Sequence, residues 1–194
     1  MAAQKDVYLV IGGSGFVGRH IVEQLLARGD AVAVFDVVQR HHDVPFYMGN
    51  ITDEQEVLDA LQKVSIHVLE CFTSVGLIRC LQSGTTCIMH TASPTHGAKD
   101  PSIYYKVNVD GTKAVINAAI AAGVRKLVYT SSAGVVFDGH DVVNLDERAP
   151  YPEKPFDAYN DSKAKGEALV LESNGKDGLL TVALRPAGIF GLVS

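Results

Sequence analysis

A glycine-rich turn between an apolar run and an amphipathic segment most restricts the fold of this 194-residue chain. The apolar run Val7–Ile11 has the composition of a buried parallel strand. Residues 16–28 place apolar side chains on one helical face, and Gly29 follows as a stop. The turn itself consists of Gly12, Gly13, Ser14, Gly15, Phe16, Val17 and Gly18. The pattern therefore predicts a strand, a tight turn and a helix, which is the opening unit of an α/β domain.

The rest of the chain repeats this alternation of strands and helices. Apolar runs at 31–35, 86–90, Lys126–Thr130 and Leu180–Leu184 predict four more strands. Periodic segments at 53–62, 103–122 and 158–171 predict helices, the first of them capped by Thr52 and the second stopped by Gly123. Strands that alternate with helices favour an α/β fold, a doubly wound parallel sheet (Rossmann fold), over residues 1–191.

Two segments depart from this alternation. Residues 64–82 form an apolar stretch without a clear period, where a helix-to-strand connection usually takes about 2–6 residues. The stretch begins Val-Ser and ends Gln, as an intron with GT-A/G-AGT and CAG boundaries would read in frame. We therefore treat it as an atypical insertion, with a translated intron as the hypothesis and a family-specific loop as the alternative. Its apolar residues predict an exposed patch: Val68, Leu69, Phe72, Val75, Leu77, Ile78 and Leu81. Residues 192–194 are interpreted as a tail outside the domain.

Composition and charge exclude several classes of function. A net charge of -5 gives no electrostatic reason to expect binding to nucleic acid. The three cysteines, Cys71, Cys80 and Cys87, show no CxxC spacing, which favours a reducing compartment and no disulfides. The seven histidines do not fall at metal-ligand spacings, so no metal site is expected. Without a signal peptide or a long apolar run, we expect a cytoplasmic chain with no membrane anchor.

The glycine turn predicts a phosphate cradle. Glycines at 12, 15 and 18 allow a tight turn, a close approach to a pyrophosphate and close packing of helix on strand. Free amides at the start of the helix then bind phosphate. Asp36 ends the next strand, where a carboxylate binds the adenosine ribose hydroxyls and repels a 2'-phosphate. The pattern favours NAD over NADP, although Arg40 lies near enough in sequence to weaken that preference.

Tyr159 and Lys163 predict a catalytic pair. They are four residues apart, so they are neighbours on one helical face. A phenol with a pKa near 10 is a poor base at neutral pH, and a nearby ammonium favours the phenolate. The serines after Thr130 lie at the carboxyl end of a predicted strand, where a hydroxyl can hydrogen-bond a substrate oxygen. A glycine loop, a serine and Tyr-x-x-x-Lys in this order together predict a hydride-transfer enzyme.

These motifs resemble those of the extended short-chain dehydrogenase/reductases, and within them the 3β-hydroxysteroid dehydrogenase-like branch. The resemblance covers residues 7–62 and 84–191, and includes the segments at 12–18, 90–94, 107–112, 130–133, 159–163 and 185–191. It implies that Ser132, Tyr159 and Lys163 act together and that Asn108 supports them. It also implies that Thr91, Ala92 and Ser93 line the cofactor, that Pro186 adjoins the nicotinamide, and that Asn50 and Ile51 lie near the adenine. The chain departs from the usual family pattern at Ile11 and Asn50, where Thr and Asp are common; neither change puts cofactor binding in serious doubt.

The resemblance further implies a reaction. Tyr159, as phenolate, takes the proton of a sterol 3β-hydroxyl while hydride leaves to NAD, Ser132 holds the oxygen, and Lys163 supports Tyr159 and touches the ribose. A substrate with a 4α-carboxylate then gives a β-keto acid, which loses carbon dioxide readily, as required in sterol biosynthesis. Family members continue after Gly191 into a smaller C-terminal substrate domain that this chain lacks. We therefore expect cofactor binding, and impaired or absent sterol turnover.

Three other readings remain open from the sequence. A nucleotide-sugar epimerase and a dihydroflavonol-type reductase share the fold, the catalytic residues and the cofactor. A non-catalytic NAD-binding fragment is the third. The resemblance also suggests a homodimer through helices 103–122 and 158–171, and association with the endoplasmic reticulum surface.

Overall fold

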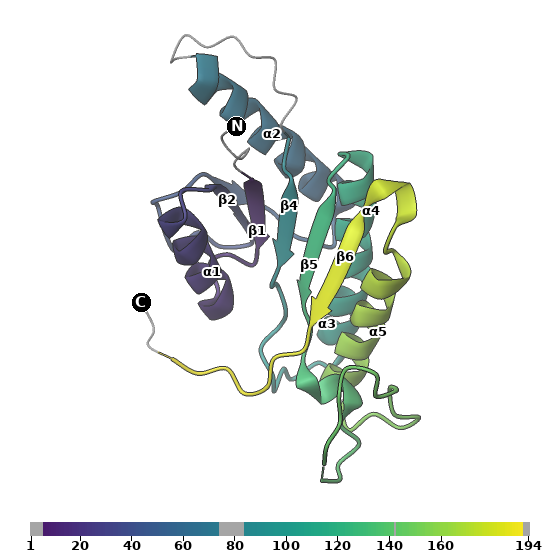
Figure 1. The fold of residues 1–194 in the computed structure, drawn as a ribbon. Helices are drawn as coiled ribbons and strands as arrows, with labels where there is room; N and C mark the ends of the chain where they lie inside the picture. Colours follow the sequence, from purple (N-terminus) through teal and green to yellow (C-terminus); the bar gives the residue numbers. More distant parts are fainter. Residues whose placement is uncertain (1–5, 74–83, 142, 192–194) are drawn as a thin grey trace.

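The computed structural model describes residues 6–73, 84–141 and 143–191, with the side chains of 65–73 excepted. Within this part of the chain, six parallel strands form one sheet of order β3-β2-β1-β4-β5-β6 (Figure 1). The strands are β1 (Val7–Ile11), β2 (Ala31–Asp36), β3 (Phe46–Met48), β4 (Cys87–His90), β5 (Lys126–Thr130) and β6 (Leu180–Leu184). The helices are α1 (Phe16–Ala27), α2 (Glu54–Thr73), α3 (Ser102–Tyr105), α4 (Thr112–Ala121) and α5 (Ala158–Glu172). Short helical turns are η1 (Lys106–Gly111), η2 (Ala133–Val136) and η3 (Lys176–Gly178).

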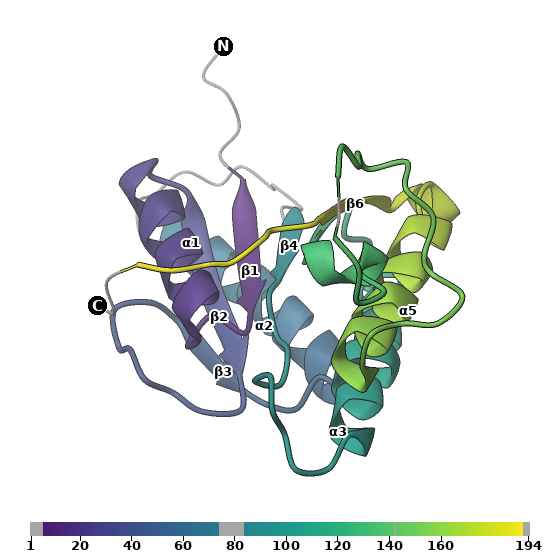
Figure 2. The same ribbon diagram turned by 90° about the horizontal axis from the view of Figure 1, so that it is seen from below.

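The predicted doubly wound parallel fold is confirmed, because helices cover both faces of the sheet (Figures 1 and 2). Successive residues of a strand point to opposite faces, so β1 contributes to two cores. Leu9 and Ile11 pack with α2, α4 and α5, whereas Tyr8 and Val10 pack with Val22 and the rest of α1. The central strands carry apolar side chains on both faces and so contribute to both cores, as expected of a buried parallel sheet.

One strand was missed, and two predicted helices differ from the structure. The strand β3 was missed, because its apolar run has only three residues, fewer than the four to eight that indicate a strand. The helix predicted over 53–62 is capped by Asp53 rather than Thr52, since the Asp53 Oδ1 accepts hydrogen bonds from the amides of Gln55 and Glu56 at 3.0 and 3.2 Å. That helix also continues to Thr73, so the predicted end at Gln62 is wrong. It thus extends into the segment 64–82, and the exposed apolar patch predicted there lies outside the described side chains.

The helix predicted over 103–122 is interrupted rather than continuous. Its middle turn, η1, is a π-helix between α3 and α4. Two neighbouring elements press on this turn. A Cβ on Gly111 would lie 2.6 Å from the Ile51 side chain, and a Cβ on Gly166 of α5 would lie 2.3 Å from the Asn108 carbonyl oxygen. The π-turn therefore lets α5 approach the sheet closely at the level of Asn108.

The sheet is covered unevenly at its β6 edge. Leu180, Val182 and Leu184 are 59%, 45% and 51% exposed, and their partners on β5 are exposed or only partly buried. They share a face with Val128, which is on the α1 side of the sheet. The segment after β6 then runs across the carboxyl ends of the strands toward α1 (Figure 2), where a Cβ on Gly191 would lie 3.1 Å from the Phe16 ring.

No helix among the described residues is long and apolar enough to cross a membrane.

Candidate functional site

The glycine loop lies at the point where the strand order reverses, between the carboxyl ends of β1 and β4. Gly12 has a φ of +81°, and a Cβ there would lie 2.6 Å from the amide nitrogen of Ala92. A Cβ on Gly18 would lie 2.2 Å from the Gly12 carbonyl oxygen, so this glycine packs α1 onto the turn. At Gly15 the nearest atom to a Cβ would be 3.3 Å away, which leaves this side of the loop open. The three glycines thus have three different surroundings: a tight turn, an open face and a packing contact.

The open face of the loop is suited to an anion. Gly15 is the N-cap of α1 and has no side-chain capping bond, so the first amides of the helix are directed outward. A pocket of about 380 Å³ lies here. It is lined by Ser14, Gly15, Phe16, Arg19, His20, Arg40 and His41. Gly15 lines this space without a side chain, as a glycine cradle for a pyrophosphate requires.

Asp36 is fixed beside the loop. One carboxylate oxygen accepts the amide of Ser14 at 3.0 Å, and the other accepts the amide of Val37 at 2.7 Å. Both bonds are made at the end of β2, next to the first turn of α1. The carboxylate is therefore held at the position predicted for a ribose contact, while Arg40 is exposed on the rim of the same pocket.

The end of β4 adjoins the cradle from the other side. The Thr91 hydroxyl donates to the carbonyl oxygen of Ile11 at 2.8 Å, which ties β4 to the strand before the glycine loop. Ala92 is in contact with the loop through Gly12. Ser93 reaches the opposite direction and hydrogen-bonds the Tyr159 side chain. Residues 91–93 thus connect the phosphate cradle to the tyrosine predicted to be catalytic.

The two residues predicted to lie near an adenine differ from one another. Asn50 is exposed, and its side-chain oxygen accepts the amide of Thr52 at 3.0 Å. Ile51 is 6% exposed and packs against Gly111. The side chain of Ile51 therefore belongs to the core.

Ser132 and Tyr159 come from separate elements that pack directly on each other. Ser132 caps η2, where its Oγ accepts the amide of Gly134 at 3.1 Å. A Cβ on Gly134 would lie 2.3 Å from the side-chain oxygen of Asn160, so only a glycine lets η2 approach the start of α5 this closely. Asp157 caps α5, because its Oδ1 accepts the amide of Asn160 at 2.7 Å. These contacts set the serine hydroxyl beside the first turn of the helix that carries Tyr159.

Tyr159 is half-buried between two other rings. Its ring meets the edges of His96 and Tyr104, with centroid separations of 5.4 and 5.6 Å. Burial raises the pKa of the Tyr159 phenol, and the hydrogen bond with Ser93 opposes this rise. The sequence predicted that Lys163 lowers this pKa. The structure describes no contact between the Lys163 ammonium and Tyr159, because the ammonium is turned toward β5.

Lys163 is almost completely enclosed, with 2% of the residue exposed. Its Nζ donates to the carbonyl oxygen of Thr130 at 2.6 Å and lies 4.4 Å from the centroid of the Tyr129 ring. Burial lowers the pKa of this ammonium to about 8, and the nearby Glu167 carboxylate opposes the change. An amine with a pKa so close to neutrality is a common feature of functional sites.

Asn108 lies behind this lysine in η1. It is 1% exposed, and its Nδ2 donates to the Ser162 hydroxyl at 3.0 Å. Its side-chain oxygen has no hydrogen-bond partner among the described residues. A buried unsatisfied oxygen is costly, so its persistence here is typical of a functional position.

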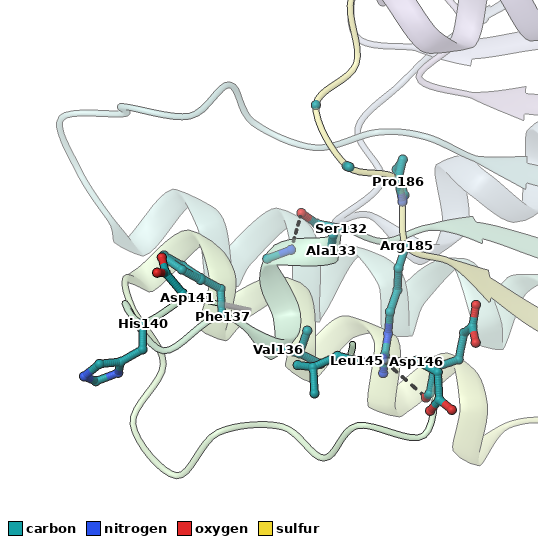
Figure 3. Close-up of a pocket in the computed structure, with 14 residues that line it drawn as sticks. Ser132, Ala133, Val136, Phe137, His140, Asp141, Leu145, Asp146, Arg185 and Pro186 are labelled. Atoms are coloured by element: carbon teal, nitrogen blue, oxygen red, sulfur yellow. Dashed lines mark hydrogen bonds between the residues drawn. The ribbon is translucent and has the colours of Figure 1, made fainter. Parts of the chain in front are cut away.

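Pro186 follows β6 and adjoins the Ser132 end of the site, while Tyr159 is outside the pocket lined by these two residues. Its carbonyl oxygen accepts the amide of Ala133 at 2.9 Å, which joins the end of β6 to the turn after Ser132. A pocket of about 750 Å³ opens between these two segments (Figure 3). Its lining includes Val136, Phe137 and Leu145. The pocket therefore combines the Ser132 end of the site with an apolar wall.

Some residues of the site were missed from the sequence. His96 and Tyr104 frame Tyr159. His96 lies in a segment without a recognisable pattern, and Tyr104 lies in a predicted helix but in no motif. Glu167 is 1% exposed and binds Arg185. A signal for Glu167 was present, since it lies four residues after Lys163 and eight after Tyr159 on one helical face. No group of three or more His, Cys, Asp or Glu side chains suited to a metal occurs in the described part.

The sheet order, the glycine loop at the switch point and the Ser132, Tyr159 and Lys163 group together define a dinucleotide-binding α/β fold of the short-chain dehydrogenase type. The chain belongs to the 3-beta hydroxysteroid dehydrogenase/isomerase family, whose sequence profile matches residues 9–194. This confirms the predicted family.

Individual relatives agree with this assignment. The chain is 42% identical over 204 residues to a decarboxylating sterol-4-alpha-carboxylate 3-dehydrogenase of Candida albicans, a match covering 98% of this chain and 53% of the relative. It is 42% identical over 185 residues to the human protein of the same description, covering 94% of this chain and 44% of the relative. The chain thus spans about half the length of these relatives.

Solved structures show the same fold. A short-chain dehydrogenase/reductase superfamily protein from Agrobacterium tumefaciens with bound NAD matches with a TM-score of 0.75 and 28% identity, over 92% of this chain and 48% of that chain. The UDP-glucose 4-epimerase of Thermus thermophilus, in complex with NAD, matches with a TM-score of 0.71 and 29% identity, over 92% and 54% of the two chains.

Proposed function

We propose that this chain carries the NAD site and the catalytic Ser132, Tyr159 and Lys163 of a decarboxylating sterol-4α-carboxylate 3-dehydrogenase. The reaction oxidises the 3β-hydroxyl of a 4α-carboxysterol to the ketone. The single observation that carries this proposal is 42% identity to enzymes of that description, in a chain whose η2 carries Ser132 directly against the start of the helix with Tyr159 and Lys163.

The residues that would hold NAD are those of the cradle. The outward amides at the start of α1 receive the pyrophosphate, and Asp36 accepts the adenosine ribose hydroxyls. Because Asp36 would repel a 2'-phosphate, NAD is preferred over NADP. When bound, NAD supplies the hydride acceptor for the reaction.

The side chains around the pocket would handle the hydroxyl. The Oγ of Ser132 already accepts a backbone hydrogen bond from Gly134, so its own proton remains to hold the substrate oxygen. Tyr159 takes the hydroxyl proton, and the buried ammonium of Lys163 favours the phenolate when the two side chains face each other. Oxidation beside a carboxylate gives a β-keto acid, which loses carbon dioxide through its enol. The apolar wall of Val136, Phe137 and Leu145 suits a sterol ring.

Turnover is tested with the 194-residue chain, by following NADH absorbance with a 4α-carboxysterol. UDP-glucose is the rival substrate, because structural neighbours include an epimerase, and its isomerisation is followed by chromatography of the sugar nucleotide because epimerisation leaves no net NADH. We expect impaired but sterol-dependent NADH formation, and a further loss of about 10³-fold in the Tyr159→Phe variant with NAD binding retained. Lys165→Gln is a matched control on the exposed side of the same helix. NAD binding without turnover of either substrate would favour the non-catalytic reading.

Cofactor choice is tested separately by thermal unfolding with NAD and with NADP. A ligand that binds the folded state at 100 times its Kd stabilises it by about 2.7 kcal/mol. We expect a clear shift with NAD, little with NADP, and a preference for NAD reduced about tenfold or more in Asp36→Ser. Equal shifts with the two cofactors in the wild type would contradict the role given to Asp36.

Homodimerisation through α4 and α5 and association with the endoplasmic reticulum surface remain proposals that rest on the family. Light scattering of the purified chain and flotation with phospholipid vesicles test them. A monomer at micromolar concentration, or no flotation, would contradict the respective proposal.

A further inference from the structure

A buried ion pair lies beneath the site, between α5 and the end of β6. Glu167 is 1% exposed, and the Arg185 Nη2 lies 2.6 Å from its Oε1. The Arg185 Nε is also within 3.0 and 3.2 Å of the two carboxylate oxygens. The Tyr151 hydroxyl donates to Glu167 at 2.8 Å. The carboxylate is thus surrounded by donors in a two-pronged geometry that is among the stronger hydrogen-bonding arrangements in proteins.

This pair joins three segments that wall the site. Glu167 belongs to the helix with Tyr159 and Lys163, and Arg185 directly precedes Pro186. Arg185 also donates to the carbonyl oxygen of Glu147 at 3.3 Å. In Figure 3 the Arg185 side chain extends from the strand end toward this loop. The distance from Pro186 to the catalytic helix and to the pocket rim therefore depends on one carboxylate.

The same carboxylate acts on Lys163, which lies one helical turn before it. Although burial opposes its ionisation, hydrogen bonds from Arg185 and its neighbours hold the pKa of Glu167 below the ordinary value. The resulting negative charge opposes the loss of the Lys163 proton. Arg185, Glu167 and Lys163 thus form a sequence of positive, negative and positive charges inside the protein.

Stability by itself is a weak reason for such a pair, because a buried ion pair often contributes no more than apolar residues of the same volume. We propose that Glu167 and Arg185 are positioning residues that fix the Pro186 segment against α5 and set the charge of Lys163. This inference rests on the proposed function for the role of Lys163, but the charge coupling is measurable without cofactor or substrate.

The ionisable groups that face Lys163 and Glu167 come from every neighbouring element. They are His90 on β4, Tyr129 on β5, Tyr159 on α5, Tyr151 in the preceding loop and Arg185 after β6. Burial lowers the pKa of His90 to about 3, and burial raises the pKa values of Tyr129 and Tyr151. These three side chains therefore stay neutral between about pH 6 and pH 10, which leaves Glu167 and Arg185 as the fixed charges that act on Lys163.

The test is the titration of Lys163 by NMR, with lysine labelled at Cε and the signal assigned from Lys163→Met. Glu167→Gln removes the negative charge and exposes Lys163 to Arg185, so its midpoint moves down by about 1 pH unit. Arg185→Gln leaves Glu167 uncompensated, so the midpoint moves up. The double variant returns toward the wild type, and Lys165→Gln leaves the midpoint unchanged. Opposite shifts are the signature of charge coupling, since loss of structure would move both single variants the same way.

Shifts in the same direction, or none, would overturn the proposal. If a glutamine variant does not fold, Glu167→Asp and Arg185→Lys retain the charges and lose the two-pronged geometry. They are expected to keep the Lys163 midpoint near that of the wild type and to weaken NAD binding. If the Lys163 midpoint in these variants moves as far as the value of a lysine in the unfolded chain, the Glu167–Arg185 pair is also rejected as the cause of the Lys163 charge.

NAD binding as a function of pH separates this inference from the proposed function. We expect affinity to fall at alkaline pH as Lys163 loses its proton, with the midpoint shifted down in Glu167→Gln and up in Arg185→Gln. A wild type that binds no NAD at any pH would reject the proposed function while leaving the NMR result to decide the charge coupling. Binding whose midpoint is the same in all variants would reject the positioning role.

Discussion

The glycine loop and the cluster around Lys163 lie at the same edge of the sheet but are built from different material. The loop is mainly backbone: its amides and carbonyls face its neighbours, and Gly12, Gly15 and Gly18 each have a defined clearance. The cluster is side chain: Lys163, Tyr129 and Glu167 meet in the interior from two elements. The glycine loop therefore depends on the space left because glycine has no side chain, and the Lys163 cluster depends on charge held away from water.

The largest expected effect breaks the loop. In Gly18→Ala, the new methyl would lie 2.2 Å from the Gly12 carbonyl oxygen and 2.7 Å from the Gly13 Cα. Both are backbone atoms, so the turn or α1 has to shift. We expect the free energy of unfolding to fall by about 3 kcal/mol, measured by urea denaturation. Wild-type stability in this variant would mean that the packing of α1 on the turn is not tight.

A matched change three residues earlier sharpens the contrast. In Gly15→Ala, the methyl would lie 3.3 Å from the Gly12 carbonyl oxygen and the backbone has φ of -80°, so the turn has to give by only a few tenths of an ångström. We expect stability to change by less than about 1 kcal/mol, whereas NAD affinity falls about tenfold because the methyl occupies the open face. Calorimetric titration measures the affinity. Unchanged binding would place the pyrophosphate elsewhere.

The smallest expected effect comes from a substitution in the side-chain cluster. It raises the stability of the fold, whereas the glycine substitutions lower it. Burial lowers the pKa of Lys163 to about 8 from 10.5, so the unfolded chain holds this proton more tightly than the folded chain. The charged lysine therefore costs stability below about pH 8, and the cost disappears as pH rises toward about 10.5. In Lys163→Met we expect a gain of about 1 kcal/mol at neutral pH, after the lost hydrogen bond to Thr130 is counted.

Urea denaturation at about pH 7, 9 and 10.5 measures this gain, which should shrink with each step. Lys165→Gln, which changes an exposed lysine on the same helix, serves as the control and should show no such trend. A Met variant less stable than the wild type at neutral pH would mean that the contacts of the ammonium outweigh its burial.

Much of the fold was predictable because its elements have local causes. The strands β1, β5 and β6 match their predicted bounds, since each is an apolar run ended by a glycine, a hydroxyl residue or a proline. The end of α2 was not predictable. Val64 carries no stop signal that would end the helix, and residues 64–82 have no helical period that would show it continuing. The π-turn at Asn108 was also hidden, since no local pattern marks it and its close contact with Gly166 of α5 is made across about 58 residues of sequence.

The sequence by itself determined the order of strands and helices, the cradle and the pairing of Tyr159 with Lys163 on one helix. These follow from short-range rules: period 2 or 3.6, glycine at turns, and residues four apart on a helix. Only the tertiary structure decided which way the Lys163 ammonium points, that burial raises the pKa of Tyr159, and that Glu167 pairs with Arg185. The physical reason is that desolvation and charge coupling depend on atoms brought together from distant parts of the chain, and no local pattern records those distances.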